Sequence, residues 1–204
     1  MGKLYLVRHG QATEPDDLRL PGIDLSLTPA GYTQARALAE RLAALAPAAV
    51  HSSDLQRAQQ TGEIIASRCG VPLIVRSDLR ELDFGTWNGR TYAEIVAVYP
   101  VAARFFDDVR SQIPPGGELA EAAAARVRAA LAEIAGETGD GSAVVVGHAG
   151  SLRLALAQEL GMLLRAYWRL RLDDASLSVV DWTEHGIILD CLNDVSHLQK
   201  CGSP

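Results

Sequence analysis

Short apolar runs of strand length alternate along the chain with longer segments whose apolar residues recur at helical spacing. Two runs are the clearest, LYLV at 4–7 and AVVV at 143–146, and glycine follows each of them closely. Runs of this length with such ends are typical of buried strands. We predict strands at 4–7, 48–51, 71–75 and 143–146, and a hairpin of two further strands at 176–182 and 187–192.

The helical segments carry recognisable start and stop signals. Apolar residues recur every three or four positions between 35 and 45, and this stretch follows Thr28, a candidate cap, and Pro29, which suits a first turn. Pro47 ends it. Ser53 or Asp54 is predicted to cap the next helix. The helices predicted after Pro47 lie at 55–68, 91–99, 101–110, 118–135 and 151–161, with a loop at 81–90.

Strands that alternate with helices indicate a largely parallel sheet covered on both faces. We therefore predict an α/β fold, a three-layer α/β/α sandwich, with residues 1–204 forming a single domain. The stretch 84–117 is predicted to be a helical excursion that overhangs a site. It ends in the turn signal PPGG at 114–117. In such sheets ligands bind beyond the carboxyl ends of the strands.

Composition and charge limit the partners and the cellular compartment that we expect for the protein. Of 204 residues 48% are hydrophobic and 22% charged, and the net charge is −6, which argues against nucleic acid or anionic membranes as partners. The three cysteines have no metal-site spacing, and no apolar run is long enough for a signal peptide or a membrane span. We expect a cytoplasmic protein without a membrane partner, and a homodimer is left open. An anionic substrate would need a local positive pocket.

Two predicted strands end in the same way, with a histidine next to glycine. The strand at 4–7 leads into Arg8-His9-Gly10, and the strand at 143–146 leads into Gly147-His148-Ala149-Gly150. The strand at 48–51 leads on to Arg57, and the strand at 71–75 leads on to Glu81. If these strands are parallel, one edge of the sheet collects Arg8, His9, Arg57, Glu81 and His148.

Two guanidiniums and two imidazoles around one point suit a phosphate dianion, because arginine offers a planar fork of donors. A neutral histidine in that ring is a candidate nucleophile, with an ordinary pKa of about 6.5. Glu81 is the candidate acid that protonates a leaving oxygen and the base that activates water. Asp78 and Asp83 lie in the same stretch, so the sequence leaves open which carboxyl faces the pocket.

Five segments in order resemble the histidine phosphatase superfamily, also called phosphoglycerate mutase-like. They are LVRHGQAT at 6–13, LTPAGYTQA at 27–35, SSDLQRAQQT at 52–61, LRELDFGTWNG at 79–89 and VVGHAG at 145–150. The resemblance implies the phosphoglycerate mutase-like fold, His9 as the residue that becomes phosphohistidine, and a phosphate pocket of Arg8, Arg57 and His148. It implies Glu81 as proton donor, and no metal or organic cofactor.

Departures from the family pattern favour a phosphatase, a hydrolase of small phosphomonoesters, over a mutase. Mutases of this family usually carry Ser and Asn three and six residues after the nucleophile, where this chain has Ala12 and Pro15, and they have a longer insertion after the proton donor. The segments PPGGE at 114–118 and LNDVSHL at 192–198 look like alpha-ribazole 5'-phosphate phosphatases of cobalamin biosynthesis and broad-specificity relatives. Mutase-type transfer and a silent phosphate-binding protein are the alternatives.

Several residues have less specific interpretations. Gln11, Gly22 and Ala149 are the candidate substrate contacts, although Gln11 could equally cap the turn after its strand. Arg153, three residues past Gly150, is expected to pair with a carboxylate on a neighbouring helix, although its nearness to the pocket leaves a functional role open. Three histidines, His51, His185 and His197, are expected to be structural or exposed and not catalytic. Four aromatic residues are expected either to fill the core or to line a specificity pocket: Trp87, Tyr92, Phe105 and Phe106.

Overall fold

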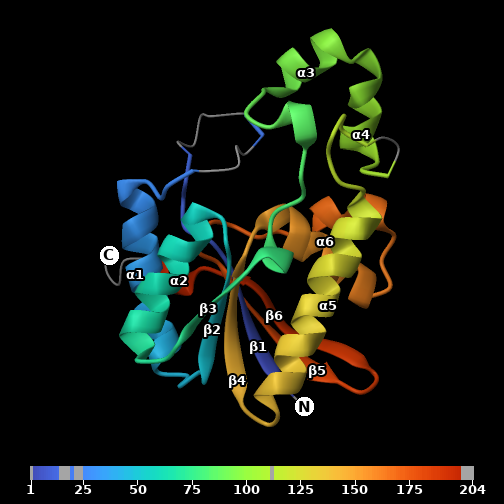
Figure 1. The fold of residues 1–204 in the computed structure, drawn as a ribbon. Helices are drawn as coiled ribbons and strands as arrows, with labels where there is room; N and C mark the ends of the chain where they lie inside the picture. Colours follow the sequence, from blue (N-terminus) through green and yellow to red (C-terminus); the bar gives the residue numbers. More distant parts are fainter. Residues whose placement is uncertain (1, 14–18, 21–24, 111–112, 199–204) are drawn as a thin grey trace, which may run out of the picture.

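A six-stranded sheet forms the centre of the molecule (Figure 1), in the order β3-β2-β4-β1-β5-β6. The computed structural model describes residues 2–13, 19–20, 25–110 and 113–198. Neighbouring strands among β1 to β4 pair in parallel, whereas β5 runs antiparallel to β1 and β6 antiparallel to β5. The strands are β1 (Lys3–Arg8), β2 (Ala49–Ser53), β3 (Leu73–Arg76), β4 (Ser142–Gly147), β5 (Leu177–Thr183) and β6 (Gly186–Asp194).

Helices cover both faces of this sheet. In Figure 1, α1 and α2 lie together on one side and α5 and α6 on the other, while α3 and α4 stand above one end of the sheet. The prediction of a three-layer α/β/α arrangement with a mostly parallel sheet is confirmed. The α-helices are α1 (Pro29–Ala43), α2 (Gln56–Cys69), α3 (Tyr92–Val98), α4 (Ala103–Asp107), α5 (Ala120–Thr138) and α6 (Ala149–Glu159).

The alternation of side chains along β1 divides the core into two layers. Leu4 and Leu6 pack in the cluster that contains residues of α5 and α6, whereas Tyr5 and Val7 pack in the cluster that contains residues of α1 and α2. Successive side chains of a strand point to opposite faces, so a continuous apolar run is what a strand buried on both faces requires. The central strand therefore holds the two layers in register.

The stretch 84–117 forms a separate apolar cluster above the sheet. Phe84, Trp87, Ile95, Phe105 and Val109 pack together and against the first turns of α5. Thr86 N donates to Pro115 O, and Glu118 N donates to Asp83 O, which joins the two ends of the stretch. Phe84 also lines the cavity described below. That residues 1–204 form one domain remains a prediction.

The predicted cap of α2 is wrong. The N-cap residue is Leu55, which makes no side-chain cap hydrogen bond. Ser53 is instead hydrogen-bonded to His148, and both carboxylate oxygens of Asp54 accept from Arg80. Ser53 Oγ also accepts from Leu55 N at 3.3 Å, but neither side chain is the cap of α2, and each contacts a residue distant in sequence.

Other boundaries differ from the predictions by smaller amounts. Helix α6 begins at Ala149, two residues earlier than expected, which makes His148 its N-cap residue. Short 3₁₀ helices form at Gly85–Trp87, within the predicted loop, and at Pro100–Ala102, where the predicted helix 101–110 was expected to begin. A further one, Leu164–Arg169, had no signal in the sequence analysis. Among the described residues, no helix is long and apolar enough to cross a membrane.

The start of α1 is packed directly on the turn that follows β1. A Cβ atom added to Gly31 would lie 2.1 Å from the carbonyl oxygen of Gln11, and one added to Gly10 would lie 2.6 Å from the carbonyl oxygen of Gly31. Thr28 caps the helix through its hydroxyl, which accepts from Gly31 N at 3.1 Å. Only backbone without a side chain can approach this closely.

We expect Gly31→Ala to destabilise the protein by about 1–3 kcal/mol, because the new methyl group forces the helix start away from the turn. Urea unfolding followed by circular dichroism measures this change. Gly136→Ala is the matched control: Gly136 is exposed in α5 and has no atom within 4 Å of an added Cβ. The control should be neutral or more stable by up to about 1 kcal/mol. Equal stability of Gly31→Ala and the wild type would contradict the packing argument.

Candidate active site

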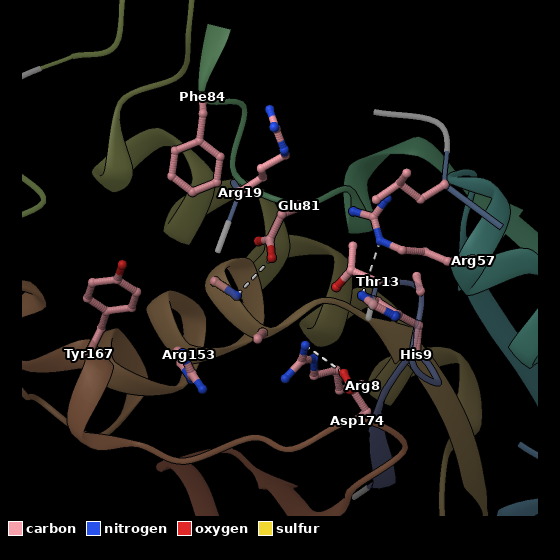
Figure 2. A pocket seen from close by; sticks show the side chains of 14 residues that line it. Arg8, His9, Thr13, Arg19, Arg57, Glu81, Phe84, Arg153, Tyr167 and Asp174 are labelled. Atoms are coloured by element: carbon pink, nitrogen blue, oxygen red, sulfur yellow. Dashed lines mark hydrogen bonds and ion pairs between the residues drawn. The ribbon is translucent and has the colours of Figure 1, made fainter. Parts of the chain in front are cut away.

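A cavity of about 340 Å³ opens beyond the carboxyl ends of the parallel strands. The register of β1 and β4 places Arg8 opposite Gly147, and His9 N donates to Gly147 O at 3.1 Å, so both strand ends meet here. Figure 2 shows the side chains that surround the opening. The cavity is lined by Arg8, His9, Ala12, Thr13, Arg19, Leu25, Arg57, Glu81, Phe84, Ala149, Gly150, Arg153, Tyr167 and Asp174.

The hydrogen bonds of His9 define a neutral imidazole. Its Nδ1 lies 2.7 Å from the carbonyl oxygen of Gly10, which can only accept, so Nδ1 carries the proton. Its Nε2 accepts from Arg57 Nε at 3.1 Å. Burial, and then the Arg57 and Arg8 guanidiniums, hold the pKa of His9 well below its usual value. The ring therefore presents an unprotonated Nε2 at the cavity, which is the form a nucleophile needs.

His148 lies behind His9 and is completely buried. The two ring centroids are 5.1 Å apart, and His148 Nε2 is 2.9 Å from Ser53 Oγ. Burial is the main cause that lowers the pKa of His148 well below its usual value, and the neighbouring His9 ring and nearby arginines act in the same direction. His148 was predicted to form part of the phosphate pocket, but it does not line the cavity. Its Nδ1 is buried and has no partner among the described residues.

Arg8 reaches the cavity from the end of β1 and is already held in place. Its Nη1 donates to Leu172 O at 2.8 Å, and its Nη2 lies 2.6 Å from Asp174 Oδ1. Arg57 comes from the first turn of α2 and is almost fully buried beside His9. The predicted meeting of two arginines at this edge is what the structure has, with one guanidinium on each side of the nucleophile candidate (Figure 2).

Glu81 sits on the amino end of α6. Gly150 N donates to its Oε2 at 3.0 Å, and Ser151 N donates to its Oε1 at 2.7 Å. The first N–H groups of a helix have no partner within it, and the two oxygens of Glu81 accept from two of them. A Cβ at position 150 would lie 2.6 Å from Glu81 Oε1, so a larger residue there would make the carboxyl group shift. The carboxyl group lines the cavity across from His9.

The neighbouring acids have other partners. Both carboxylate oxygens of Asp78 accept from Arg76, and Asp83 Oδ1 accepts from Gly85 N and Asn88 Nδ2. Neither residue lines the cavity. Of the three carboxyls that the sequence left open, Glu81 is the one at the site.

Two of the candidate substrate contacts can be located. Ala149 lines the cavity at the first position of α6. Gln11 does not line it, because its Oε1 accepts from Thr28 Oγ1 and its carbonyl oxygen accepts from Thr28 N, so it supports the start of α1. Gly22 lies outside the described residues.

Arg153 is placed differently from the prediction. It lines the cavity instead of pairing with a carboxylate, and its buried Nε has no partner among the described residues. Burial and the nearby Arg8 lower the pKa of its guanidinium. The cavity is also lined by four residues for which no site role was predicted: Tyr167, from the unpredicted 3₁₀ helix, and Arg19, Phe84 and Asp174. The position of Arg153, one helical turn after Ala149, was the available signal for it.

The structure also places most of the aromatic residues and histidines for which the sequence left two positions open. Trp87 and Phe105 belong to the buried cluster, Tyr92 is half exposed, and none of the three lines the cavity. His51 is buried in β2, and His185 is exposed. The side chain of Phe106 lies outside the described residues. Within the described ranges no group of three His, Cys, Asp or Glu side chains could hold a metal ion.

Comparisons with known proteins agree with this site. The model of the histidine phosphatase superfamily (branch 1) matches residues 4–195. A "Probable phosphoglycerate mutase GpmB" from Enterobacter sp. strain 638 is 34% identical to the chain, over 97% of this chain and 95% of the relative.

Two solved structures share the fold over nearly their whole length. A mycobacterial glucosyl-3-phosphoglycerate phosphatase, complexed with VO3, has a TM-score of 0.83 and 32% identity, covering 94% of this chain and 98% of the other. A provisionally named alpha-ribazole-5'-P phosphatase from Escherichia coli K-12 has a TM-score of 0.85 and 29% identity, covering 95% and 96%. The resemblance found in the sequence is confirmed, as is the prediction of an enzyme, a histidine phosphatase. The chain belongs to branch 1 of the histidine phosphatase superfamily.

Proposed function

We propose that this chain hydrolyses a small phosphomonoester in two steps through a phosphorylated His9. The observation that carries the proposal is the neutral His9 ring, whose Nε2 faces the cavity between the Arg8 and Arg57 guanidiniums. In the first step Nε2 attacks phosphorus, the bond from phosphorus to the leaving oxygen breaks, and Glu81 gives that oxygen a proton. In the second step Glu81 takes a proton from water, which attacks phosphorus and releases His9.

The surroundings of His9 support each step. Phosphoryl transfer is accelerated mainly by positioning and by positive charge on the equatorial oxygens, which the two guanidiniums supply. Nδ1–H donates to Gly10 O, and this hydrogen bond stabilises the positive charge that the ring gains on phosphorylation. Arg57 Nε occupies the lone pair of Nε2 in this structure, so the incoming phosphate must draw that guanidinium to its own oxygens before attack.

As substrate, alpha-ribazole 5'-phosphate is the first candidate. The segments PPGGE and LNDVSHL support it, as does the name of the E. coli neighbour. We place the reaction in the cytoplasm because Cys69 and Cys191 are free thiols.

A second candidate function is mutase-type transfer on a phosphoglycerate. Arg153 favours it, since a guanidinium beyond the two beside His9 could bind a carboxylate on the substrate. The name of the Enterobacter relative points the same way. In this reaction the phosphohistidine outlives the departure of the intermediate and returns its phosphate to a rebound molecule.

We expect His9→Ala to abolish release of p-nitrophenol from p-nitrophenyl phosphate while the circular dichroism spectrum stays unchanged. His185→Ala, an exposed histidine in the β5–β6 turn, is the control and should keep full activity. The wild type should form an acid-labile, base-stable phosphoprotein and remain active in EDTA, because no step uses a metal. Full activity of His9→Ala would contradict the mechanism. Phosphate binding without turnover by the wild type would identify a catalytically silent phosphate-binding protein.

Glu81→Gln should lower kcat for an alkyl phosphate about 100-fold or more, because a poor leaving oxygen needs the proton. With p-nitrophenyl phosphate the first step needs no acid, so rapid mixing should show one equivalent of p-nitrophenol followed by slow turnover. Asp83→Asn, a neighbouring acid outside the cavity, should behave like the wild type. Loss of the burst itself, or an equal loss in Asp83→Asn, would remove Glu81 from this role.

The two substrate candidates respond differently to a change at Arg153. If the substrate carries a carboxylate, Arg153→Ala should lower kcat/KM for 3-phosphoglycerate about 10-fold or more, the loss of one charge-assisted hydrogen bond. p-Nitrophenyl phosphate has no carboxylate and loses no hydrogen bond to Arg153. Its kcat/KM should therefore stay within about twofold of the wild-type value. Arg36→Ala, an exposed arginine of α1, is the control. The mutase is rejected if the wild type turns over alpha-ribazole 5'-phosphate faster than 3-phosphoglycerate, whether or not a bisphosphate primer accompanies the 3-phosphoglycerate.

A further inference from the structure

The guanidinium of Arg8 is oriented by a short segment that precedes β5. We call residues 172–176 the Arg8 strap. Leu172 supplies the carbonyl oxygen that accepts from Nη1 at 2.8 Å, and Asp174 supplies the carboxylate oxygen 2.6 Å from Nη2, as Figure 2 shows for the aspartate. With both ends of its fork held, the guanidinium has one orientation at the cavity.

The backbone of the strap is bonded to the same part of β1. Arg8 N donates to Ser176 O at 3.3 Å, and Ala175 N donates to His9 O at 3.0 Å. Ala175 has a φ of +53°, a left-handed conformation that is unfavourable for an L-residue other than glycine. A conformation of this kind persists only where neighbouring contacts hold it.

Those contacts come from the C-terminal end of the chain. Asn193 Oδ1 accepts from Asp173 N at 2.6 Å, and Asn193 Nδ2 donates to Asp173 Oδ2 at 3.0 Å. His197 Nε2 is 3.0 Å from the carbonyl oxygen of Ala175, so the ring nitrogen donates. Ala175 therefore links His197 to His9 through its own carbonyl and amide groups.

The segment that carries His197 is itself bound to α1. Arg41, near the end of that helix, forms an ion pair with Asp194 and donates to Ser196 Oγ at 2.9 Å. Its Nη1 also lies 3.5 Å from His197 Nδ1, the nitrogen that remains as an acceptor. The C-terminal segment is thus bound to the scaffold on one side and to the Arg8 strap on the other.

We propose that Asn193 and His197 are positioning residues for phosphate binding, which hold the Arg8 strap so that the Arg8 guanidinium faces the phosphate. The inference rests on the proposed function in one respect, that Arg8 contacts the phosphoryl group. It gives a task to the LNDVSHL segment, which the proposed reaction does not use directly. A displaced guanidinium loses the matched geometry of its two N–H donors, and misplacement of about 1 Å can cost 100-fold.

The test removes the Asn193 side chain without straining the backbone. Asn193 has a φ of +60°, which glycine adopts freely, so Asn193→Gly removes only the contacts to Asp173. Calorimetric titration with inorganic phosphate should show binding weakened about 10-fold or more, with a similar fall in kcat/KM for p-nitrophenyl phosphate. Asp190→Asn is the control on the same strand, since its carboxylate pairs with Lys3 at the surface, and it should change neither quantity.

A double-mutant cycle separates positioning from general destabilisation. In an Arg8→Ala background Asn193→Gly should lower kcat/KM no further, because the guanidinium that it orients is gone. An equal loss in both backgrounds, or no loss in phosphate affinity of the fully folded single variant, overturns the proposal. If the wild type binds phosphate but shows no turnover, the proposed function fails while the phosphate titrations still decide this inference.

His197 provides a second variant in case Asn193→Gly does not fold. His197→Ala should weaken phosphate binding, and His197→Gln should restore it, because the amide Nε2 can donate to the carbonyl oxygen of Ala175 in place of the ring. Equal affinity of both variants, whether weakened or unchanged, contradicts a role that depends on this hydrogen bond.

Discussion

The parallel pairing of β1 with β4 is the constraint on which the rest of the structure depends. It sets Arg8 opposite Gly147 and lets His9 N donate to Gly147 O, so that two strand ends bring two histidine rings to 5.1 Å. A shift of one residue would exchange the two faces of β1 and turn the side chains of each core layer toward the wrong helices. Burial of the core therefore fixes the register, and the register fixes the site.

Positive charge at this edge has consequences for the histidines it surrounds. The chain carries a net charge of −6, yet four arginines and two carboxylates line the cavity. Burial and, among these arginines, the Arg57 and Arg8 guanidiniums lower the pKa of both His9 and His148, which disfavours their protonated forms. An anion that enters finds donors already oriented, because Arg8 is held by the strap and Glu81 by the start of α6. Charge in the site and rigidity around it are two results of the same packing.

Sequence reasoning succeeded where local pattern and chemistry coincide and failed where side chains have distant partners. Thr28 caps α1 as predicted because the cap needs only a hydroxyl and the next few amides. Ser53 and Asp54 look equally suitable for α2, yet neither caps it, and each has a side-chain partner distant in sequence, His148 for Ser53 and Arg80 for Asp54. Arg153 has the spacing of a surface helix residue, and only the meeting of α6 with the strand ends turns it toward the cavity.

The sequence by itself determined the order of strands and helices along the chain, the mostly parallel sheet and four of the polar residues at its edge, Arg8, His9, Arg57 and His148. Apolar runs and strand-ending histidines are local features that need no knowledge of distant contacts. Only the tertiary structure decided that Glu81, and neither Asp78 nor Asp83, reaches the cavity, and that Asn193 and His197 support the strap of Arg8. The physical reason is that hydrogen-bond partners are chosen by proximity in space. Residues 81 and 150, or 175 and 197, become neighbours only after the layers have packed.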